Sequence, residues 1–207
     1  MLEGLSSGVP PIKEFSSIIT QKINDWTSSH GTELDLIVES GRFLVAGAGL
    51  LVTSVVNLKR ARGEQLAILD AGYNLPFDSL ILRQSYPITV LRRDESPLRE
   101  EVKLAGNLCD SFDVLLPPRG EGKGVGLPAL EVGDLVVFEM AGAYTNVFNL
   151  SFNCKTKSPI IFRNVKGKLV VARESIEELY EEEVSAEAYG IAFRRAKLTS
   201  IKFKLKA

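Results

Sequence analysis

The sequence predicts a mainly β protein, in which a β-barrel or β-sandwich domain follows the last helix and strand of a broken α/β domain. Two patterns support this fold class. Before residue 45, apolar residues recur at helical spacing and lead directly into a short apolar run. After residue 45, short runs rich in β-branched residues alternate with glycine-containing turns, which is typical of an antiparallel sandwich or barrel.

Composition excludes several other classes. The chain has 207 residues, of which 45% are hydrophobic and 25% charged, so it can bury a core. Its formal net charge of −1 argues against a nucleic-acid partner, and no apolar run is long enough to cross a membrane. The first residues do not resemble a secretory signal, and two cysteines cannot form a disulfide framework or a zinc site. We therefore expect a soluble, cytoplasmic protein without a metal.

The first element is an amphipathic helix over residues 12–26, whose apolar residues fall at spacings of three and four. Pro10 and Pro11 suit its start, and the segment 28–31 suits its end. An apolar strand is predicted at 34–38. A helix that leads directly into such a strand is the second half of a βαβ unit, and no strand can be placed before Pro10.

The β domain is predicted from five runs, at residues 50–56, 65–69, 88–91, 135–138 and 168–171. The Gly- and Pro-rich segment 117–128 is expected to be an irregular surface loop. Residues 174–184 form an acidic pattern expected to be a solvated helix. From residue 192 onward all charges are positive, which favours a lysine-protected edge strand or a frayed end. The alternative for this basic tail is a contact with nucleic acid or an acidic lipid.

The segment 39–42, Glu-Ser-Gly-Arg, follows the predicted strand at 34–38. The carboxyl ends of parallel strands are where α/β folds place ligands. Glu39, the Gly41 backbone and Arg42 could there hold an anion and a protonated ring nitrogen. Alternatively, this is an ordinary strand-to-turn junction with an exposed ion pair.

Three further positions carry possible chemistry. Cys109 is a thiol next to Asp110, and the pair could donate a proton and bind a substrate amine. The alternative is a small buried hydrophobe beside a turn aspartate. Tyr144 follows a strand and a glycine, so its hydroxyl could reach a phosphate, or its ring could simply pack. His30, the single histidine, is explained by the carbonyl groups at a helix end.

Taken together, these motifs occur in an order that resembles the C-terminal half of the fold-type III, pyridoxal-phosphate-dependent amino-acid decarboxylases. That family includes the diaminopimelate and ornithine decarboxylases, and its β domain is similar to that of alanine racemase. The resemblance spans about residues 4–184 and implies that a remnant of a TIM barrel precedes the β domain. The motifs lie at residues 39–42, 70–74, 109–113, 142–144 and 152–153.

The resemblance also implies roles. Glu39 would pair with the pyridine nitrogen of the cofactor, while Gly41, Arg42 and Tyr144 would bind its phosphate. Cys109 would enter the site from a partner subunit to help protonate the product, and Asp110 would contact the distal group of the substrate. Asp113 would shape the loop.

The chain departs from the family pattern in four places. Ser40 replaces a proline, and of a phosphate-binding glycine loop only Gly8 remains. The segment 75–78, Leu-Pro-Phe-Asp, stands where diaminopimelate decarboxylases have Arg-Pro and Tyr. Together with the short Asp110, this suits a substrate with a distal amine such as ornithine or lysine. The lysine that forms the Schiff base belongs to a part of the barrel with no counterpart here.

We therefore predict three regions: a barrel remnant at 1–44, a β domain at 45–184 and a basic extension at 185–207. The chain is expected to be part of a decarboxylase and inactive by itself. Its partner would be a second copy in a homodimer or a separately encoded N-terminal barrel. The alternative is a non-enzymatic module that regulates a full-length decarboxylase.

Overall fold

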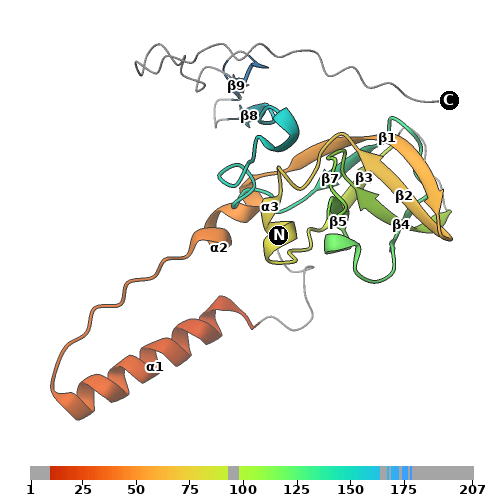
Figure 1. Ribbon diagram of the computed structural model, residues 1–207. Coiled ribbons are helices and arrows are strands. Elements are labelled where there is room, and N and C mark those ends of the chain that lie inside the picture. Colours follow the sequence, from red (N-terminus) through yellow and green to blue (C-terminus); the bar gives the residue numbers. More distant parts are fainter. Residues whose placement is uncertain are drawn as a thin grey trace, which may run out of the picture. The chain divides into compact units, whose positions relative to one another are not determined.

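The computed structural model describes residues 10–92, 98–163, 167, 169–172, 174–176 and 178 (Figure 1). The chain divides into two compact units, Met1–Asn149 and Leu150–Ala207. The described residues include no helix with the length and apolar character that a membrane crossing needs.

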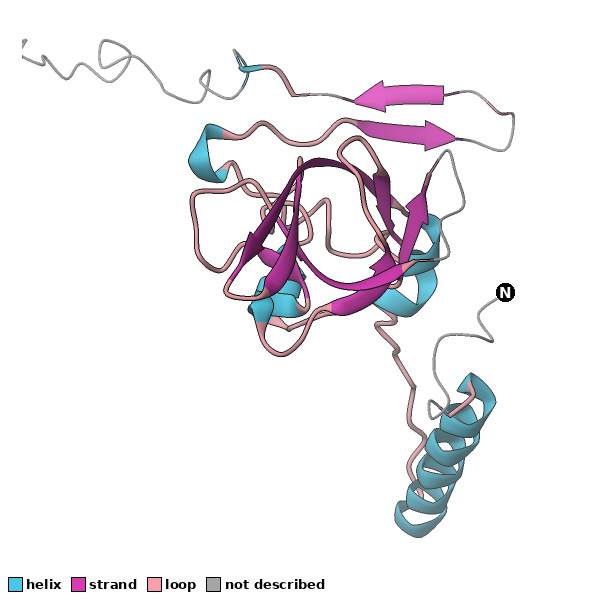
Figure 2. Ribbon diagram, turned by 90° about the vertical axis from the view of Figure 1, so that its right-hand side faces the viewer, coloured by secondary structure: helices cyan, strands magenta, loops and turns pink. Residues whose placement is uncertain are grey.

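The first unit is built on one seven-stranded sheet, which curls around its own core (Figure 2). Its path runs β3-β7-β1-β2-β4-β5, with β6 also paired to β4. Only β2 and β4 are parallel; all other neighbours in this sheet are antiparallel. The strands are β1 (Leu51–Ala61), β2 (Glu64–Leu69), β3 (Ile88–Leu91), β4 (Arg99–Ala105), β5 (Val114–Leu116), β6 (Val125–Pro128) and β7 (Leu135–Phe138). The prediction of a mainly β fold is confirmed.

The core lies inside the curl of this sheet. In β1, Thr53 and Val55 are buried while Val52 and Val56 are exposed, which is the two-residue period of a strand with one inner face. The largest fully buried apolar side chains come from β1, β2, β4, β5 and β7: Val55, Leu69, Val102, Leu104, Leu115, Val136 and Phe138.

The helices of the first unit are α1 (Ile12–His30), α2 (Gly41–Val45) and α3 (Phe77–Ile81), with short 3-10 turns η1 (Ala46–Ala48) and η2 (Pro118–Gly120). As predicted, α1 begins after Pro11, and it ends at Gly31, whose positive φ of 63° lets its N–H bond to the Thr27 carbonyl. His30 Nδ1 lies 2.9 Å from the Trp26 carbonyl oxygen, which agrees with the predicted contact at the helix end.

The predicted strand at 34–38 is wrong. Residues 33–40 form neither helix nor strand in the described chain and run as a drawn-out segment between α1 and α2 (Figure 1), and Ile37 is 85% exposed. A strand needs a neighbour to receive its backbone hydrogen bonds, and apolar character alone does not supply one.

The prediction that 117–128 is wholly irregular is also wrong. Residues Val125–Pro128 form β6, which pairs with β4 from Val102 to Arg99. Leu127 is buried, and Gly124 has no side chain because a Cβ there would lie 2.7 Å from the Val102 nitrogen. Gly124 therefore allows a close approach to β4, where composition alone had suggested a loop.

In the second unit, η3 (Phe152–Cys154) precedes β8 (Ile160–Arg163) and β9 (Leu169–Ala172), which pair antiparallel. The strand expected at 168–171 thus forms one residue later. Most of the predicted acidic helix at 174–184 lies outside the described residues, and so does the basic tail. The three regions predicted at 1–44, 45–184 and 185–207 stay predictions.

Candidate functional site

Gly41, Arg42 and Tyr144 come together although about a hundred positions separate them in the sequence. A Cβ on Gly41 would lie 3.1 Å from the Tyr144 hydroxyl, so the absence of a side chain leaves the hydroxyl open to the start of α2. The Arg42 guanidinium carbon lies 4.9 Å from the centre of the Tyr144 ring, within cation–π range. Tyr144 is 41% exposed, so this cluster faces solvent.

A pair of glycines holds the two segments of this cluster together. A Cβ on Gly142 would lie 2.0 Å from the Val45 carbonyl oxygen, and one on Gly49 would lie 2.5 Å from the Gly142 Cα. Because neither residue has a side chain, the backbones touch: Ala141 N–H donates to Gly49 O and Gly142 N–H to Ala46 O, both at 2.9 Å. The end of β7 is thereby fixed against the end of α2.

Tyr144 itself has a left-handed backbone, with a φ of 67°. This region is unfavourable for a residue with a large side chain, and such residues concentrate at functional positions. Its ring stacks on Phe148, with 5.6 Å between centroids and 18° between planes.

Sequence reasoning missed the residue that anchors Arg42. Asp78, fully buried in α3, accepts a hydrogen bond from Arg42 Nη2 at 2.6 Å, and Tyr86 donates its hydroxyl to the other Asp78 oxygen. Partial burial opposes the charge of Arg42, but its hydrogen bond and attraction to Asp78 outweigh that effect and raise its pKa. Burial and the bond to Asp78 raise the pKa of Tyr86 as well. No spacing in the sequence links positions 42, 78 and 86.

Cys109 and Asp110 lie in a second place, the loop between β4 and β5. Cys109 is exposed. Asp110 accepts from the Phe112 N–H and from the Tyr73 hydroxyl, both at 2.8 Å, and these bonds lower its pKa, so it is a carboxylate at neutral pH. Burial, then the bond to Asp110, raises the pKa of Tyr73 to about 12.

Asp113 holds this loop, as predicted. Its carboxylate is buried and accepts the backbone N–H groups of Tyr73 and Leu108, both at 2.7 Å. Gly106 provides the room, since a Cβ there would lie 2.1 Å from the carboxylate. Asp113 thus ties the segment 70–74 to the loop that carries Cys109.

A row of aromatic rings runs between the two places. Tyr73 contacts Phe77 at 6.1 Å between centroids, Phe77 contacts Phe148 at 6.5 Å, and Phe148 stacks on Tyr144. At one end of the row the Tyr73 hydroxyl donates to Asp110, and at the other end the Tyr144 ring lies against the Arg42 guanidinium.

The six predicted site residues are only partly brought together. Gly41, Arg42 and Tyr144 form one cluster, while Cys109 and Asp110 lie in the loop between β4 and β5. Glu39 is exposed and its side chain makes no hydrogen bond or ion pair with the described part of the chain; its carbonyl accepts from Gly41 N–H at 3.0 Å. In residues 10–92 and 98–163, no group of three His, Cys, Asp or Glu is arranged to hold a metal ion.

The sequence profile described as "Pyridoxal-dependent decarboxylase, C-terminal sheet domain" matches residues 34–142, more than half of the chain. The chain belongs to this family. The match includes Glu39, Gly41, Arg42, Cys109 and Asp110, and it ends two residues before Tyr144.

Diaminopimelate decarboxylases are similar to this decarboxylase-family chain. That of Streptomyces coelicolor is 32% identical over 162 residues, which are 76% of this chain and 37% of the relative. That of Escherichia coli K12 is 32% identical over 155 residues, with 72% and 37% covered. A crystal structure of the Helicobacter pylori enzyme complexed with L-lysine has a TM-score of 0.70 and 26% identity, covering 86% of this chain and 41% of that one. The chain thus spans well under half the length of these relatives.

The residues present fit the cofactor that the family name implies. A phosphate needs hydrogen-bond donors and positive charge at a place open to solvent. The Tyr144 hydroxyl and the Arg42 guanidinium supply both, and the missing Cβ of Gly41 leaves space beside the hydroxyl. Gly41, Arg42 and Tyr144 could therefore hold a phosphate at the start of α2, and we call this cluster the phosphate corner.

Proposed function

We propose that this chain supplies the C-terminal part of the active site of a pyridoxal-phosphate-dependent decarboxylase that acts on a diamino acid. The observation that carries the proposal is the meeting of Gly41, Arg42 and Tyr144 in a chain whose residues 34–142 match the family. When bound, the cofactor would accept the electron pair of the carbon–carboxylate bond that breaks as carbon dioxide leaves.

The residues of the phosphate corner would bind and orient. Arg42 would hold the phosphate by charge-assisted hydrogen bonds, and Tyr144 would donate its hydroxyl to the same group. Glu39 would keep a proton on the ring nitrogen; its exposed carboxylate, two residues before Gly41, is open to such a contact.

Cys109 and Asp110 would act on the substrate. Loss of carbon dioxide leaves an electron pair on the α-carbon, and the exposed Cys109 thiol would donate a proton there. Asp110, ionised and partly exposed, suits the distal ammonium of a diamino acid. Diaminopimelate, lysine and ornithine all carry such an ammonium, and the names of the relatives favour diaminopimelate.

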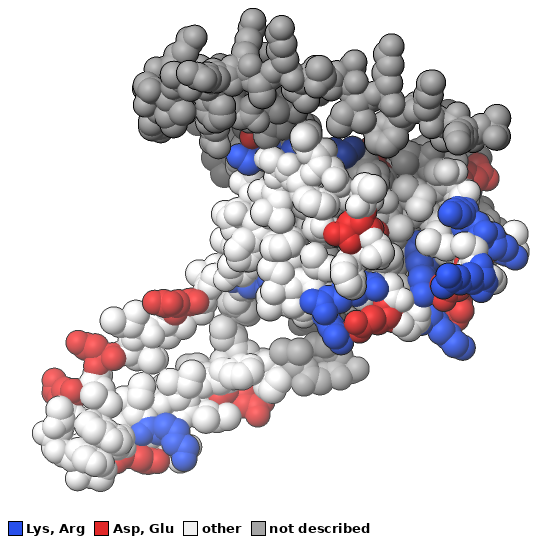
Figure 3. Space-filling view, in the orientation of Figure 1, with Lys and Arg blue, Asp and Glu red and all other residues white. Residues whose placement is uncertain are grey.

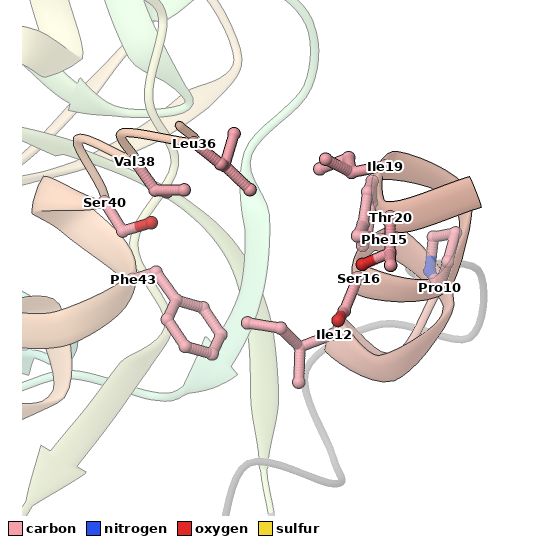
Figure 4. Close-up of a pocket in the computed structure, with 10 residues that line it drawn as sticks. All are labelled: Pro10, Ile12, Phe15, Ser16, Ile19, Thr20, Leu36, Val38, Ser40 and Phe43. Carbon is pink, nitrogen blue, oxygen red and sulfur yellow. The ribbon is translucent and has the colours of Figure 1, made fainter. Parts of the chain in front are cut away.

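The region before β1 suggests where a partner would bind. Residues 33–40 are unpaired within the described chain, and most apolar residues of α1 are exposed. In Figure 3, uncharged surface lies between several acidic side chains in this region. A groove of about 410 Å³ opens there (Figure 4), lined among others by Ile12, Phe15, Ile19, Leu36, Val38 and Phe43. Burying each such side chain is worth about 1.5–3 kcal/mol.

We propose that a cofactor-binding barrel covers this region, with its edge strand pairing to residues 33–40. The covering surface would belong to a barrel domain or to a second copy of this chain in a homodimer. Residues 1–207 alone would be inactive, because the resemblance places the Schiff-base lysine in the barrel.

Two measurements test this proposal. Mixing residues 1–207 with pyridoxal phosphate and borohydride should give no reduced adduct on a specific lysine, and such an adduct would contradict the inactivity. Adding the N-terminal part of the Streptomyces relative should restore release of carbon dioxide from diaminopimelate, lysine or ornithine.

The restored activity should be lost with Arg42→Ala and kept with Arg60→Ala, which removes an exposed arginine of β1. If the chain binds a full-length decarboxylase and changes its rate but never completes a barrel, the regulatory alternative is favoured instead.

A further inference from the structure

We propose that Asp78 and Tyr86 are positioning residues for Arg42, which fix its guanidinium so that it presents free donors to a phosphate. The inference rests on the proposed function, because it takes Arg42 as the phosphate ligand. It goes further in assigning the orientation of Arg42 to two residues outside the recognised motifs.

The geometry gives the carboxylate no other role. Asp78 is fully buried, and one of its oxygens accepts from Arg42 Nη2 at 2.6 Å while the other accepts from the Tyr86 hydroxyl. Both oxygens are therefore used inside the protein. A buried carboxylate with both oxygens paired cannot reach a substrate, but it can hold its arginine in one place.

The guanidinium is fixed from two directions. Asp78 binds its edge through Nη2, and the Tyr144 ring lies against it at 4.9 Å. A guanidinium has five N–H donors in a rigid plane, so fixing one edge and one face orients the others. The Arg42 side chain is 32% exposed, so this ordered group still reaches the surface where Tyr144 lies.

The arrangement of Tyr86 supports the same role. Its ring packs edge-on against Phe138 of the core, with 6.2 Å between centroids. Tyr86 thus connects the Asp78 carboxylate to the buried core of the sheet. The position of Arg42 is in this way set by the core of the β domain.

A purely electrostatic role of Asp78 and a positioning role predict opposite effects of Asp78→Ala on phosphate binding. If Asp78 acted only by its charge, Asp78→Ala would tighten phosphate binding, because a negative neighbour is lost. If it positions Arg42, the same substitution weakens binding, because the guanidinium becomes mobile.

The test compares pyridoxine 5′-phosphate with pyridoxine on residues 1–207, since neither has the aldehyde that would react with lysines. The ratio of the two dissociation constants isolates the phosphate. In Asp78→Ala we expect the preference for the phosphate form to fall about tenfold, the worth of one charge-assisted hydrogen bond. Tyr86→Phe, which keeps the ring against Phe138, should lower it less, and Ser79→Ala, at a buried neighbour in α3, should leave it unchanged.

A second readout needs no ligand. In ¹⁵N-NMR spectra the Arg42 Nη2 protons, which donate to Asp78, should exchange slowly and be ordered in the wild type and in Ser79→Ala, and they should lose this protection in Asp78→Ala. An equally ordered Arg42 in Asp78→Ala, or a tighter phosphate preference, would overturn the inference.

The same measurements give a different result if the proposed function itself is wrong. If Arg42→Ala leaves the phosphate preference unchanged, or the wild type shows no preference, Arg42 is not the phosphate ligand, and the NMR result then decides the role of Asp78 by itself. If Arg42→Ala removes the preference and Asp78→Ala does not lower it, only the positioning role is wrong.

Discussion

Replacing Asp113 should destabilise the β domain more than its place in a surface loop suggests. The Asp113 carboxylate is 4% exposed and accepts two buried backbone N–H groups, those of Tyr73 and Leu108, each at 2.7 Å. Asp113→Ala leaves both donors without this acceptor. A hydrogen bond to a charged group contributes about 1.5–3 kcal/mol, so the loss of two should cost about 3–6 kcal/mol.

Asp113→Asn tests the hydrogen bonds of this side chain without changing its volume. The amide has the shape of the carboxylate, but its NH₂ group cannot accept, so one of the two backbone donors loses its acceptor. We therefore expect about half the effect of Asp113→Ala, or about 1.5–3 kcal/mol.

The assay is equilibrium unfolding in urea followed by circular dichroism. With a slope of about 1–3 kcal/mol per molar urea, a loss of 3 kcal/mol lowers the midpoint by about 1–3 M. Asp110→Ala is the matched control, since Asp110 lies in the same loop and is partly exposed, and it should lower the midpoint much less. Equal midpoints for the wild type and Asp113→Ala would refute the reasoning.

Two further predictions concern the site. Gly142→Ala should destabilise the chain by about 1–3 kcal/mol, because its Cβ would lie 2.0 Å from a backbone oxygen. Gly47→Ala is the control and should be tolerated, because the nearest atom to a Cβ there is 3.7 Å away. Equal urea midpoints for the two variants would contradict the close approach at Gly142. The Tyr73 phenol should titrate near pH 12, because burial and the bond to Asp110 raise its pKa. Its contribution to stability is complete below pH 10 and is lost as the pH rises toward 12. NMR of ¹³C-labelled tyrosine should show a lower pKa in Asp110→Asn, and an unchanged titration would exclude the bond to Asp110 as a cause.

Local pattern was sufficient for much of the fold. The helix α1 and five of the strands follow from apolar spacing and β-branched runs, because the period of an element is written in adjacent residues. The strand at 34–38 failed for the opposite reason. Its pattern is suitable, but a strand exists only where a neighbour accepts its hydrogen bonds, and that neighbour is not among the described residues.

The sequence by itself determined the β character of this chain, its family motifs and the residues Gly41, Arg42 and Tyr144, because each is a matter of residue type and local order. Only the tertiary structure decided that Asp78 binds Arg42 across 36 positions and that Asp113 accepts from Tyr73 across 40. Such pairs depend on the path of the sheet between them. A buried carboxylate is stable only where the fold brings donors to it, and no local pattern specifies which donors those are.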